Sequence, residues 1–475
     1  MKFRKVVIFF LIMFSGTYNI FSQVFLANDP NPGSCGAVVC STWPREMTEL
    51  NGAMFYKGRD HINNEPFELW RYDEVNEPFI VSNGLFESPS NLTVIDSLLY
   101  FNAKDNDGWD VWKYNGVDDP IQITNLNTTG GSGGFNYFTK YHDKIYFTAW
   151  GGNGSGLMTY DPVTGTVEDV FPVSTYISPS SLIVYHDTLY FSANDGMFGY
   201  ELWQYSGSGN PTLRVDLDAG ANSSNITPLI IFDDKLICSG RTTSTGHEIW
   251  TYEGTSIPSL IMDINQGIED SNPSHPVIFN NKVYFSAATI NDGVELWEYD
   301  GINIPDMIMD INSGSNSSFP DYFTIYNNVL YFSANDGVSG NELWMYDGLN
   351  PPELYEDIYA GPGESNPSDL MLFNDKLYFN ALDTIVGLEL HFISENASTN
   401  NYSSDKITVY PNPVKEALTI SFGTLNSSSD FRITNLMGKV VLSSKVIQNT
   451  VDVSSLSSGV YLLEVDGSVL RFVKE

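Results

Sequence analysis

A short motif, Glu-Leu-Trp, recurs along this 475-residue chain at nearly constant spacing. With the variants Glu248-Ile249-Trp250 and Asp110-Val111-Trp112, the copies place Trp at positions 70, 112, 203, 250, 297 and 344. Met158 and His391 stand at the Trp position in two further copies. The four steps from 203 to 391 are each 47 residues long, after steps of 42, 46 and 45. Steps this regular predict a chain built from repeated structural units.

Each unit contains four short segments. Around Trp297 they are residues 277–279, 282–287, 294–299 and 306–311, which are rich in aromatic and β-branched side chains. Turn residues such as Asn-Asn and Asn-Asp-Gly separate them and supply positive φ. This pattern predicts antiparallel strands, and four strands in a unit of this length are typical of a β-propeller blade. We expect the repeated Trp to pack between blades, and the Glu before it to bond backbone in a neighbouring loop.

The number of blades follows from the two ends of the repeat region. The last unit stops at Ser394 without a fourth strand, whereas the segment 24–29 near the N-terminus resembles a fourth strand with its exit loop. We therefore expect the N-terminal strand to complete the last blade, which removes exposed sheet edges. The predicted fold is all-β, an eight-bladed propeller followed by a small β-sandwich; seven blades with an irregular first unit is the alternative.

The repeats resemble the ELWxxDGT-type repeat of secreted bacterial proteins. The best copies are the stretches ELWEYDG and ELWMYDG, and the Thr of that pattern survives only in EIWTYEGT. The resemblance covers most of residues 40–394 and implies little about activity.

A different character begins after the polar stretch 397–405. Short strand-like segments alternate with turns over residues 406–475, which suits a small β-sandwich. This tail resembles the C-terminal sorting domain of the type IX secretion system. The matching residues are Pro411, Asn412, Pro413, Gly438, Lys439, Gly459 and Tyr461. The resemblance implies that the secretion machinery is a partner, and that the chain passes the outer membrane of a Gram-negative bacterium to be released or anchored at the surface.

The first residues read as an export signal. Lys2, Arg4 and Lys5 precede an apolar run over residues 6–14 that is too short to span a bilayer. We place cleavage after Ser22, which leaves residues 23–396 as the repeat domain, 397–405 as a linker and 406–475 as the sorting domain. No further stretch is apolar enough to cross a membrane, so we expect the mature chain to be soluble.

The balance of charge is strongly acidic, with 58 Asp and Glu against 23 Lys and Arg and a formal net charge of −35. Such a surface repels nucleic acid and anionic lipid and attracts cations. Because 42% of the residues are hydrophobic and 14% aromatic, the acid must lie on loops around a large core.

Acidic loops at equivalent places in the units are candidate calcium sites. In a four-stranded blade, the loop between strands two and three shares a face with the connection to the next blade, and both are rich in Asp, Asn and Gly. Oxygen ligands on such loops suit calcium, although no complete calcium loop is present and turn chemistry favours the same residues. The candidate ligands are Asp105, Asp107, Asp195, Asp216, Asp218, Asp263, Asp292, Asp310 and Asp336.

Residues that break the repeat are the better indicators of function. Trp109 and Trp150 lie in irregular units and are candidates for stacking on a sugar ring, or for filling a gap beside a degraded blade. Cys35 and Cys40 are a plausible disulfide in an exported chain. Cys238 stands at the position of Phe285, so we expect a buried thiol without chemistry.

No nucleophile motif, phosphate-binding glycine loop or paired metal-binding histidines occur in the sequence. We therefore expect a non-enzymatic binding or adhesion protein, secreted or on the cell surface, whose acidic face meets an extracellular glycan or protein. The rivals are a polysaccharide hydrolase or lyase with paired carboxylates near the propeller axis, and a structural surface-layer component.

Overall fold

A computed structural model provides the coordinates of the chain. It describes residues 23–28, 34–35, 38–39, 43–59, 66–125, 135–151, 154–171, 178–255, 257–383, 387–394, 408–410, 414–421, 430–435, 440–445, 450–457, 459–465 and 468–474. The predicted signal peptide and the predicted linker lie outside these residues. The described residues form two compact units, one that ends at Ser394 and one that follows it, and each is considered by itself.

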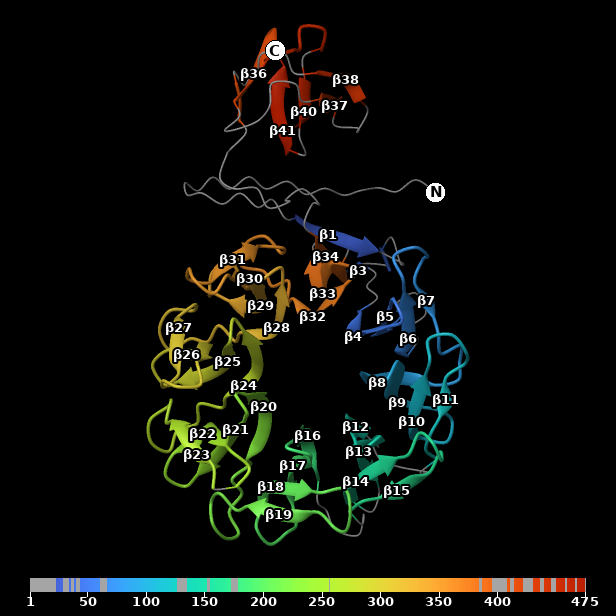
Figure 1. The fold of residues 1–475 in the computed structure, drawn as a ribbon, viewed down its shortest axis with the longest axis vertical. Helices are drawn as coiled ribbons and strands as arrows, with labels where there is room; N and C mark the ends of the chain where they lie inside the picture. The colour runs from blue at the N-terminus through green and yellow to red at the C-terminus, as the bar shows by residue number, and fades with distance from the viewer. Residues whose placement is uncertain are drawn as a thin grey trace. The chain divides into compact units, whose positions relative to one another are not determined.

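The first unit is a ring of eight four-stranded antiparallel sheets (Figure 1). Blade 1 contains β4 (Arg45–Leu50), β5 (Ala53–Gly58), β6 (Glu68–Tyr72) and β7 (Phe79–Ile80), and blade 2 contains β8 (Glu87–Ile95), β9 (Leu98–Lys104), β10 (Trp109–Tyr114) and β11 (Ile121–Gln122). Blade 3 contains β12 (Phe135–Tyr141), β13 (Lys144–Gly151), β14 (Gly154–Tyr160) and β15 (Val167–Asp169), and blade 4 contains β16 (Ser180–Tyr185), β17 (Thr188–Asn194), β18 (Tyr200–Tyr205) and β19 (Thr212–Val215). The prediction of eight blades is confirmed.

The second half of the ring repeats the same order. Blade 5 contains β20 (Thr227–Phe232), β21 (Lys235–Thr242), β22 (Gly246–Tyr252) and β23 (Ser259–Met262), and blade 6 contains β24 (Ser274–Phe279), β25 (Lys282–Thr289), β26 (Gly293–Tyr299) and β27 (Asp306–Met309). Blade 7 contains β28 (Asp321–Tyr326), β29 (Val329–Asn335), β30 (Asn341–Tyr346) and β31 (Glu353–Glu356), and blade 8 contains β32 (Ser368–Phe373), β33 (Lys376–Asp383), β34 (Gly387–Ser394) and β1 (Gln23–Asn28).

The ring is closed by the N-terminal strand, as the sequence predicts. Strand β1 pairs antiparallel with β34, with Val24 opposite Ile393 and Leu26 opposite His391. The innermost strands of neighbouring blades contact each other all the way round, including β32 with β4. Figure 1 shows these innermost strands around the axis of the ring. A small hairpin of β2 (Ser34–Cys35) and β3 (Val38–Val39), which the sequence did not predict, follows β1.

The turn between the first two strands of each blade is set by local chemistry. In blade 6, Asn280 and Asn281 have φ of 47° and 58°, which is the left-handed pair that a type I′ hairpin turn requires. The corresponding two turn residues have positive φ in all eight blades, for example His186 and Asp187 in blade 4. Asn, Asp and Gly tolerate this region better than most residues, which explains their recurrence in the sequence.

The core is divided into eight clusters, each between two neighbouring blades. Successive residues of one strand belong to different clusters: Leu330 and Phe332 of β29 pack toward blade 6, whereas Tyr331 packs toward blade 8. Trp344 lies in the cluster between blades 6 and 7, so the prediction that the repeated Trp packs between blades is confirmed. Each blade is therefore held by both neighbours.

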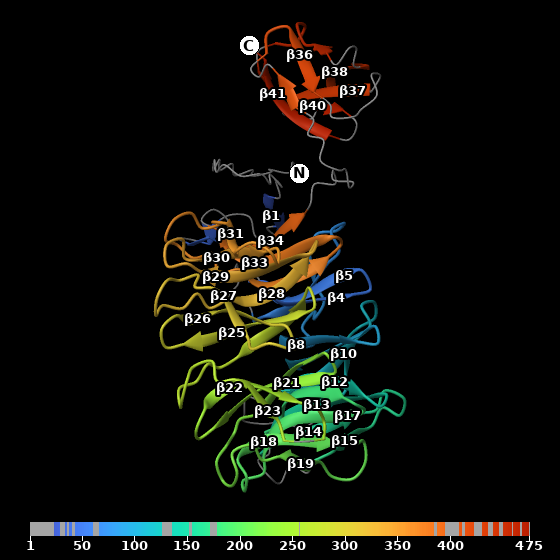
Figure 2. The same cartoon turned by 60° about the vertical axis from the view of Figure 1, so that its left-hand side comes forward.

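The second unit contains two sheets over one core. One sheet has β35 (Thr408–Tyr410), β36 (Ala417–Ser421) and β39 (Thr450–Asp452), and the other has β37 (Asp430–Asn435), β38 (Val440–Lys445), β40 (Gly459–Val465) and β41 (Ser468–Lys474). Leu418 and Val451 of the first sheet share a buried cluster with Ile433 and Leu463 of the second. The strands of both units appear from a second direction in Figure 2.

Candidate functional site

The acidic loops between the second and third strands are held by their own side chains. Oδ1 of Asp105, Asp195 and Asp336 accepts backbone N–H groups two and three residues later, at 2.7–3.0 Å. Asp292 accepts the Thr289 hydroxyl at 2.7 Å. These carboxylates cap tight turns, which is the structural role that such residues play in loops generally. Asp107 follows one of them and is exposed.

The connections between blades use a second repeated arrangement. Oδ2 of Asp216, Asp263 and Asp310 accepts the N–H of the glycine four residues later, at 3.0–3.1 Å. The other oxygen of each carboxyl is buried and has no hydrogen-bond partner among the described residues. Asp218 accepts the Thr243 hydroxyl from the adjacent blade at 3.4 Å, so loop and connection do lie on one face.

These acidic residues do not gather around one point. Within the part of the chain that the structure describes, no three His, Cys, Asp or Glu side chains are placed to hold a metal ion together. Calcium takes six to eight oxygen ligands, so a calcium site on these loops would need backbone and amide oxygens as well. Calcium binding stays a prediction.

The repeated Glu before Leu-Trp, or Ile-Trp in blade 5, ties blades 4 to 7 to the connection that follows each of them. Glu295 of β26 accepts the N–H of Ile311 at 2.9 Å, the N–H of Ser318 at 2.9 Å and the Ser318 hydroxyl at 2.5 Å. Both partners lie between β27 and β28, so the predicted bond to a neighbouring loop is confirmed. We call this arrangement the Glu–Ser clamp. It recurs with Glu201 and Ser224, Glu248 and Ser271, and Glu342 and Ser365.

Burial makes the clamp carboxyls unusually weak acids. All four glutamates are fully buried, which raises the pKa of Glu248 and Glu342 to about 7 and raises those of Glu201 and Glu295. The hydrogen bonds favour the charged form and lower the pKa, but desolvation outweighs them.

The clamp predicts that the propeller loses stability as pH rises. An unfolded Glu titrates near pH 4.3, so a carboxyl with a higher pKa in the fold binds its proton more tightly when folded. Its stabilising contribution is present in acid and is lost between about pH 4 and pH 7. For Glu248 and Glu342, we expect each carboxyl to lower the free energy of unfolding by about 2 kcal/mol between about pH 5 and pH 8. Urea unfolding at both pH values measures this, and a stability that rises over this interval contradicts it. Glu248→Gln, which has no proton to lose, should reduce the pH dependence.

The predicted aromatic and cysteine sites lie in different surroundings. Trp109 is partly buried and packs on the cluster between blades 2 and 3, beside Met158 of the degraded copy. The side chain of Trp150 and residue Cys40 lie outside the described parts, so the predicted disulfide from Cys35 does too. Cys238 pairs with Trp250 as Phe285 pairs with Trp297, and it is fully buried, which raises the pKa of its thiol.

Of the predicted sorting residues, Gly459 and Tyr461 lie in β40, and the Tyr461 hydroxyl donates to the carbonyl of Ser457 at 2.9 Å. Pro411, Asn412, Pro413, Gly438 and Lys439 lie outside the described residues. Within the residues that the structure describes, no helix is long and apolar enough to cross a membrane.

The ring brings together one set of residues that the sequence did not single out. The innermost strand of every blade has a bulge, and the residue five places before the first turn residue lies at or next to this bulge in all eight strands around the axis. We call these the axial positions. They are Glu46, Asn91, Tyr137, Ser181, Pro228, His275, Tyr322 and Asp369. Seven have φ between 52° and 59°, and Pro228, whose ring forbids positive φ, is the exception. The backbone is thus repeated while the side chains differ.

The axial positions are linked from blade to blade. Asp369 Oδ1 accepts the N–H of Glu46 at 2.8 Å, and the Glu46 carboxylate accepts the N–H of Asn91. The Asn91 amide donates to the carbonyl of Phe135 at 3.2 Å. His275 Nδ1 lies 3.4 Å from a carboxylate oxygen of Asp321, the residue before Tyr322. A polar arc therefore extends around the axis over blades 8, 1, 2 and 3, with a second contact between blades 6 and 7.

Two axial side chains are large and open to solvent. Tyr137 is 44% exposed and Tyr322 is 42% exposed. They belong to blades 3 and 7, which are four blades apart in a ring of eight and therefore lie on opposite sides of the axis. Tyrosine offers a flat ring and a hydroxyl, which suits it to amphipathic ligands. A sequence signal exists for Tyr322 but not for Tyr137: Tyr322, like five other axial residues, stands two places after a proline at the start of its unit.

Asp369 has the electrostatic character of a functional carboxyl. Burial raises its pKa first, and the nearby Asp321 carboxylate raises it further, while bonds from Glu46 and Ser368 and the charge of Arg45 act in the opposite direction. Tyr322 lies in the same field: burial, Asp369 and Asp321 all raise the pKa of its hydroxyl. A carboxyl with a raised pKa beside a second carboxylate occurs both in architecture and in acid–base sites.

Comparison with known proteins assigns the second unit. Residues 408–474 match the family described as secretion system C-terminal sorting domain. Beta-agarase D of Zobellia galactanivorans is 39% identical over 75 residues, which are 15% of this chain and 14% of that protein. The chain thus spans about a seventh of this curated relative.

Solved structures resemble the propeller at low sequence identity. PorZ, an essential surface component of the type IX secretion system of Porphyromonas gingivalis, has a TM-score of 0.46 and 14% identity over 90% of this chain and 64% of its own. The β-propeller domain of the Trilobed protease from Pyrococcus furiosus has a TM-score of 0.43 and 12% identity, over 66% of this chain and 97% of its own. A puromycin-hydrolyzing peptidase of Mycobacterium tuberculosis has a TM-score of 0.46 and 9% identity, over 72% of this chain and 57% of its own. The chain is therefore an eight-bladed β-propeller that carries a secretion-system C-terminal sorting domain, and that domain implies export through the type IX system to the cell surface or beyond.

Proposed function

We propose that this chain is an exported, non-catalytic binding protein whose propeller holds an extracellular glycan at the axial positions. One observation supports this proposal above the others: a position that the backbone repeats in every blade carries a different side chain in nearly every blade. By contrast, the position of the clamp glutamate, which builds the ring, carries Glu in six of the eight blades. Variation at a fixed place is what a single asymmetric ligand requires of a symmetric scaffold.

The chemistry of the axial positions suits sugar hydroxyl groups. The carboxylates of Glu46 and Asp369 accept hydrogen bonds, while His275 supplies ring nitrogens and Asn91 an amide. The rings of Tyr137 and Tyr322 are available for stacking on the apolar face of a pyranose.

The proposal is tested by retention of the purified protein on a panel of immobilised polysaccharides. We expect retention by at least one polysaccharide, and a loss of at least tenfold in affinity when Tyr137 and Tyr322 are both replaced by Ala. Phe79→Ala is the matched control, because Phe79 is an equally exposed aromatic residue on the outermost strand of blade 1. Equal retention of the double variant and the wild type contradicts an axial site, and no retention by any polysaccharide contradicts glycan binding and shifts the weight to a protein partner or a surface-layer role.

Repeating the panel with calcium and then with a chelator tests the calcium prediction. Retention that disappears in the chelator and returns with calcium supports bound calcium at the acidic loops, since cations bound only loosely by net charge would not restore a specific interaction. Retention that is unchanged in the chelator contradicts a role for calcium in binding.

A polysaccharide hydrolase or lyase is the second candidate function. The observation that favours it is the pair of carboxyls at Asp369 and Asp321, of which burial raises the pKa of Asp369, since two neighbouring carboxyls can divide acid and base roles. New reducing or unsaturated sugar ends in the eluates, lost in Asp369→Asn, would replace the binding proposal with catalysis. A glycan that is retained but not cleaved supports the binding proposal.

A further inference from the structure

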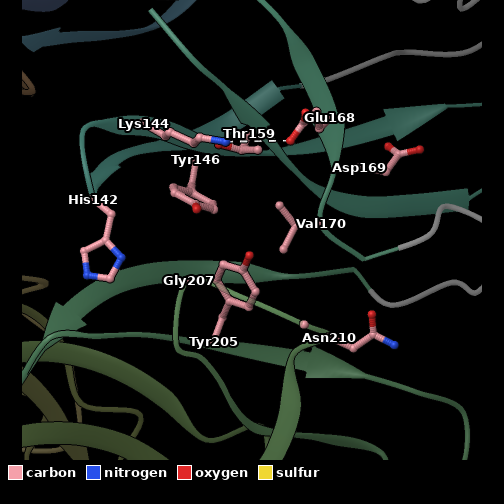
Figure 3. Close-up of a pocket in the computed structure, with 11 residues that line it drawn as sticks. His142, Lys144, Tyr146, Thr159, Glu168, Asp169, Val170, Tyr205, Gly207 and Asn210 are labelled. Carbon is pink, nitrogen blue, oxygen red and sulfur yellow. Dashed lines mark ion pairs between the residues drawn. The ribbon is translucent and has the colours of Figure 1, made fainter.

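A pocket of about 230 Å³ lies between blades 3 and 4, away from the axial positions. Figure 3 shows its lining. Lys144 and Tyr146 of β13, Thr159 of β14 and Glu168 at the end of blade 3 form one side. Tyr205 and the hairpin residue Asn210 of blade 4 form the other.

The pocket exists because two short residues replace large ones. Thr159 pairs with Tyr146, and the same register holds Lys113 opposite Tyr100, Glu298 opposite Tyr284, Met345 opposite Tyr331 and Phe392 opposite Tyr378. In those blades a long side chain extends from this position; in blade 3 the chain ends at a hydroxyl. The hairpin between β18 and β19 of blade 4 also leaves space, because Asn210 is smaller than Ile304, the residue at the same position in blade 6.

The rim of the pocket is fixed by packing. The His142 ring stacks on Tyr141 with 3.9 Å between ring centroids, and its Nε2 lies 2.8 Å from Asp187 Oδ1 of blade 4. Gly207 has φ of +89°, and a Cβ there would meet His142 Nδ1 at 2.6 Å, so the hairpin approaches as closely as only glycine permits. The pocket is thus preformed, which lowers the cost of binding.

One buried polar group in the pocket is incompletely paired. Thr159 is only 4% exposed, and its hydroxyl interacts with that of Tyr146 but makes no hydrogen bond of good geometry in the described part of the chain. A buried hydroxyl normally finds a partner, and leaving it unpaired costs about 1–3 kcal/mol. The Thr159 hydroxyl lines the pocket, so a ligand oxygen or a water molecule there would satisfy it.

The remaining polar groups offer both donors and acceptors. Lys144 and Glu168 are 3.7 Å apart and substantially exposed, so this weak ion pair leaves both free to meet a ligand. Burial, and then the neighbouring Tyr205, raises the pKa of Tyr146 to about 12, so its hydroxyl stays protonated. Asp169 adds a second carboxylate, which gives the lining more negative than positive side chains and disfavours anions.

We propose that this pocket binds one neutral sugar unit, such as the end of a glycan chain. Sugar hydroxyls need donors and acceptors together, and Lys144, Glu168 and Asn210 supply both in the lining. Tyr146 and Tyr205, which pack on each other with ring centroids 5.9 Å apart, are nearly buried and close the pocket from below. The volume is below the ~300–1,000 Å³ of sites for drug-sized ligands, which suits a single ring. The inference shares only the ligand class with the axial proposal and needs none of the axial residues.

The test is a titration of the full chain with neutral monosaccharides, including glucose, galactose, mannose and fucose. Saturation-transfer NMR and calorimetry measure the binding. Glucuronic acid and inorganic phosphate are the anionic comparators. We expect saturable binding of at least one neutral sugar, and binding at least tenfold weaker in Thr159→Met, which places in blade 3 the residue that blade 7 carries at this register. Thr251→Met, the same change at the same register in blade 5, should leave binding unaltered.

Three outcomes overturn the inference: no neutral monosaccharide binds, an anion binds more tightly, or Thr159→Met binds as well as the wild type. Should Thr159→Met fold poorly, Asn210→Ile fills the pocket from the other side with the residue of blade 6 and gives the same readout. Replacing Tyr137 and Tyr322 by Ala separates the two proposals. If this variant loses polysaccharide retention but still binds the monosaccharide, the pocket binds sugar independently of the axial positions.

Discussion

A variant that lacks residues 23–28 is expected to lose more than about 4–5 kcal/mol of stability, beyond the usual range of single substitutions. Strand β1 supplies the outermost strand of blade 8, and its removal leaves the backbone groups of β34 unpaired along one edge. Val24 and Ala27 also pack on the two core clusters that flank blade 8. Because β1 and β34 come from opposite ends of the propeller sequence, their pairing joins those ends.

Urea unfolding and hydrogen exchange measure this effect. Amides of β33 and β34 should exchange much faster in the truncated protein, while those of blade 4, on the far side of the ring, should change least. Removal of 408–474 is the control, since those residues have their own buried cluster and should leave the propeller transition in place. A truncated protein within about 1 kcal/mol of the wild type would contradict the role of β1 in closure.

Glu295→Ala is expected to destabilise the propeller by about 3–5 kcal/mol. The side chain satisfies three donors, the N–H groups of Ile311 and Ser318 and the Ser318 hydroxyl, and all of them are buried at the start of the next blade. Alanine removes the acceptor of the Ile311 N–H and leaves both Ser318 donors with only the Val294 carbonyl, at 3.0 and 3.3 Å, in a place without access to water. Glu295→Gln should cost less, because an amide oxygen still accepts.

Glu353→Ala is the matched control, because Glu353 is an exposed glutamate on the outermost strand of blade 7 and makes no clamp. We expect it to change the free energy of unfolding by less than about 0.5 kcal/mol. Equal effects of Glu295→Ala and Glu353→Ala in urea unfolding would contradict the clamp. A Ser318→Ala variant should lie between them, since it removes one of the three hydrogen bonds.

The two residues of the clamp have a constant spacing in the sequence. Each clamp Ser stands 23 residues after its Glu, as Ser318 does after Glu295. The alternation of side chains along a strand does not reveal this pair, because the Glu lies in a central strand and the Ser lies in a connection between blades. Only an alignment of the four most regular units, with attention to polar positions, would have revealed it.

Local sequence signals predict the architecture of the propeller. Strand and turn signals depend on residues close to one another, so the repeat, the antiparallel blades and the left-handed turns at pairs such as Asn280-Asn281 follow from local chemistry. The closing role of 24–29 could also be predicted. The last unit lacks a fourth strand and the N-terminal segment is an unpaired strand, so pairing the two completes the ring. Even the register of Cys238 was readable, since it depends only on counting along one unit.

The candidate sites, by contrast, depend on contacts that form only when the ring is folded. The axial positions come from eight strands up to 323 residues apart, as between Glu46 and Asp369, and they are neighbours only because the ring closes. The pocket exists because Thr159 of blade 3 and Asn210 in the hairpin of blade 4 are both short. Neither residue alone would predict a pocket from the sequence. Burial decided the rest: the same residue type is an exposed acid at Glu353 and a fully buried clamp at Glu295, since solvent access is a property of the packed ring and not of the chain.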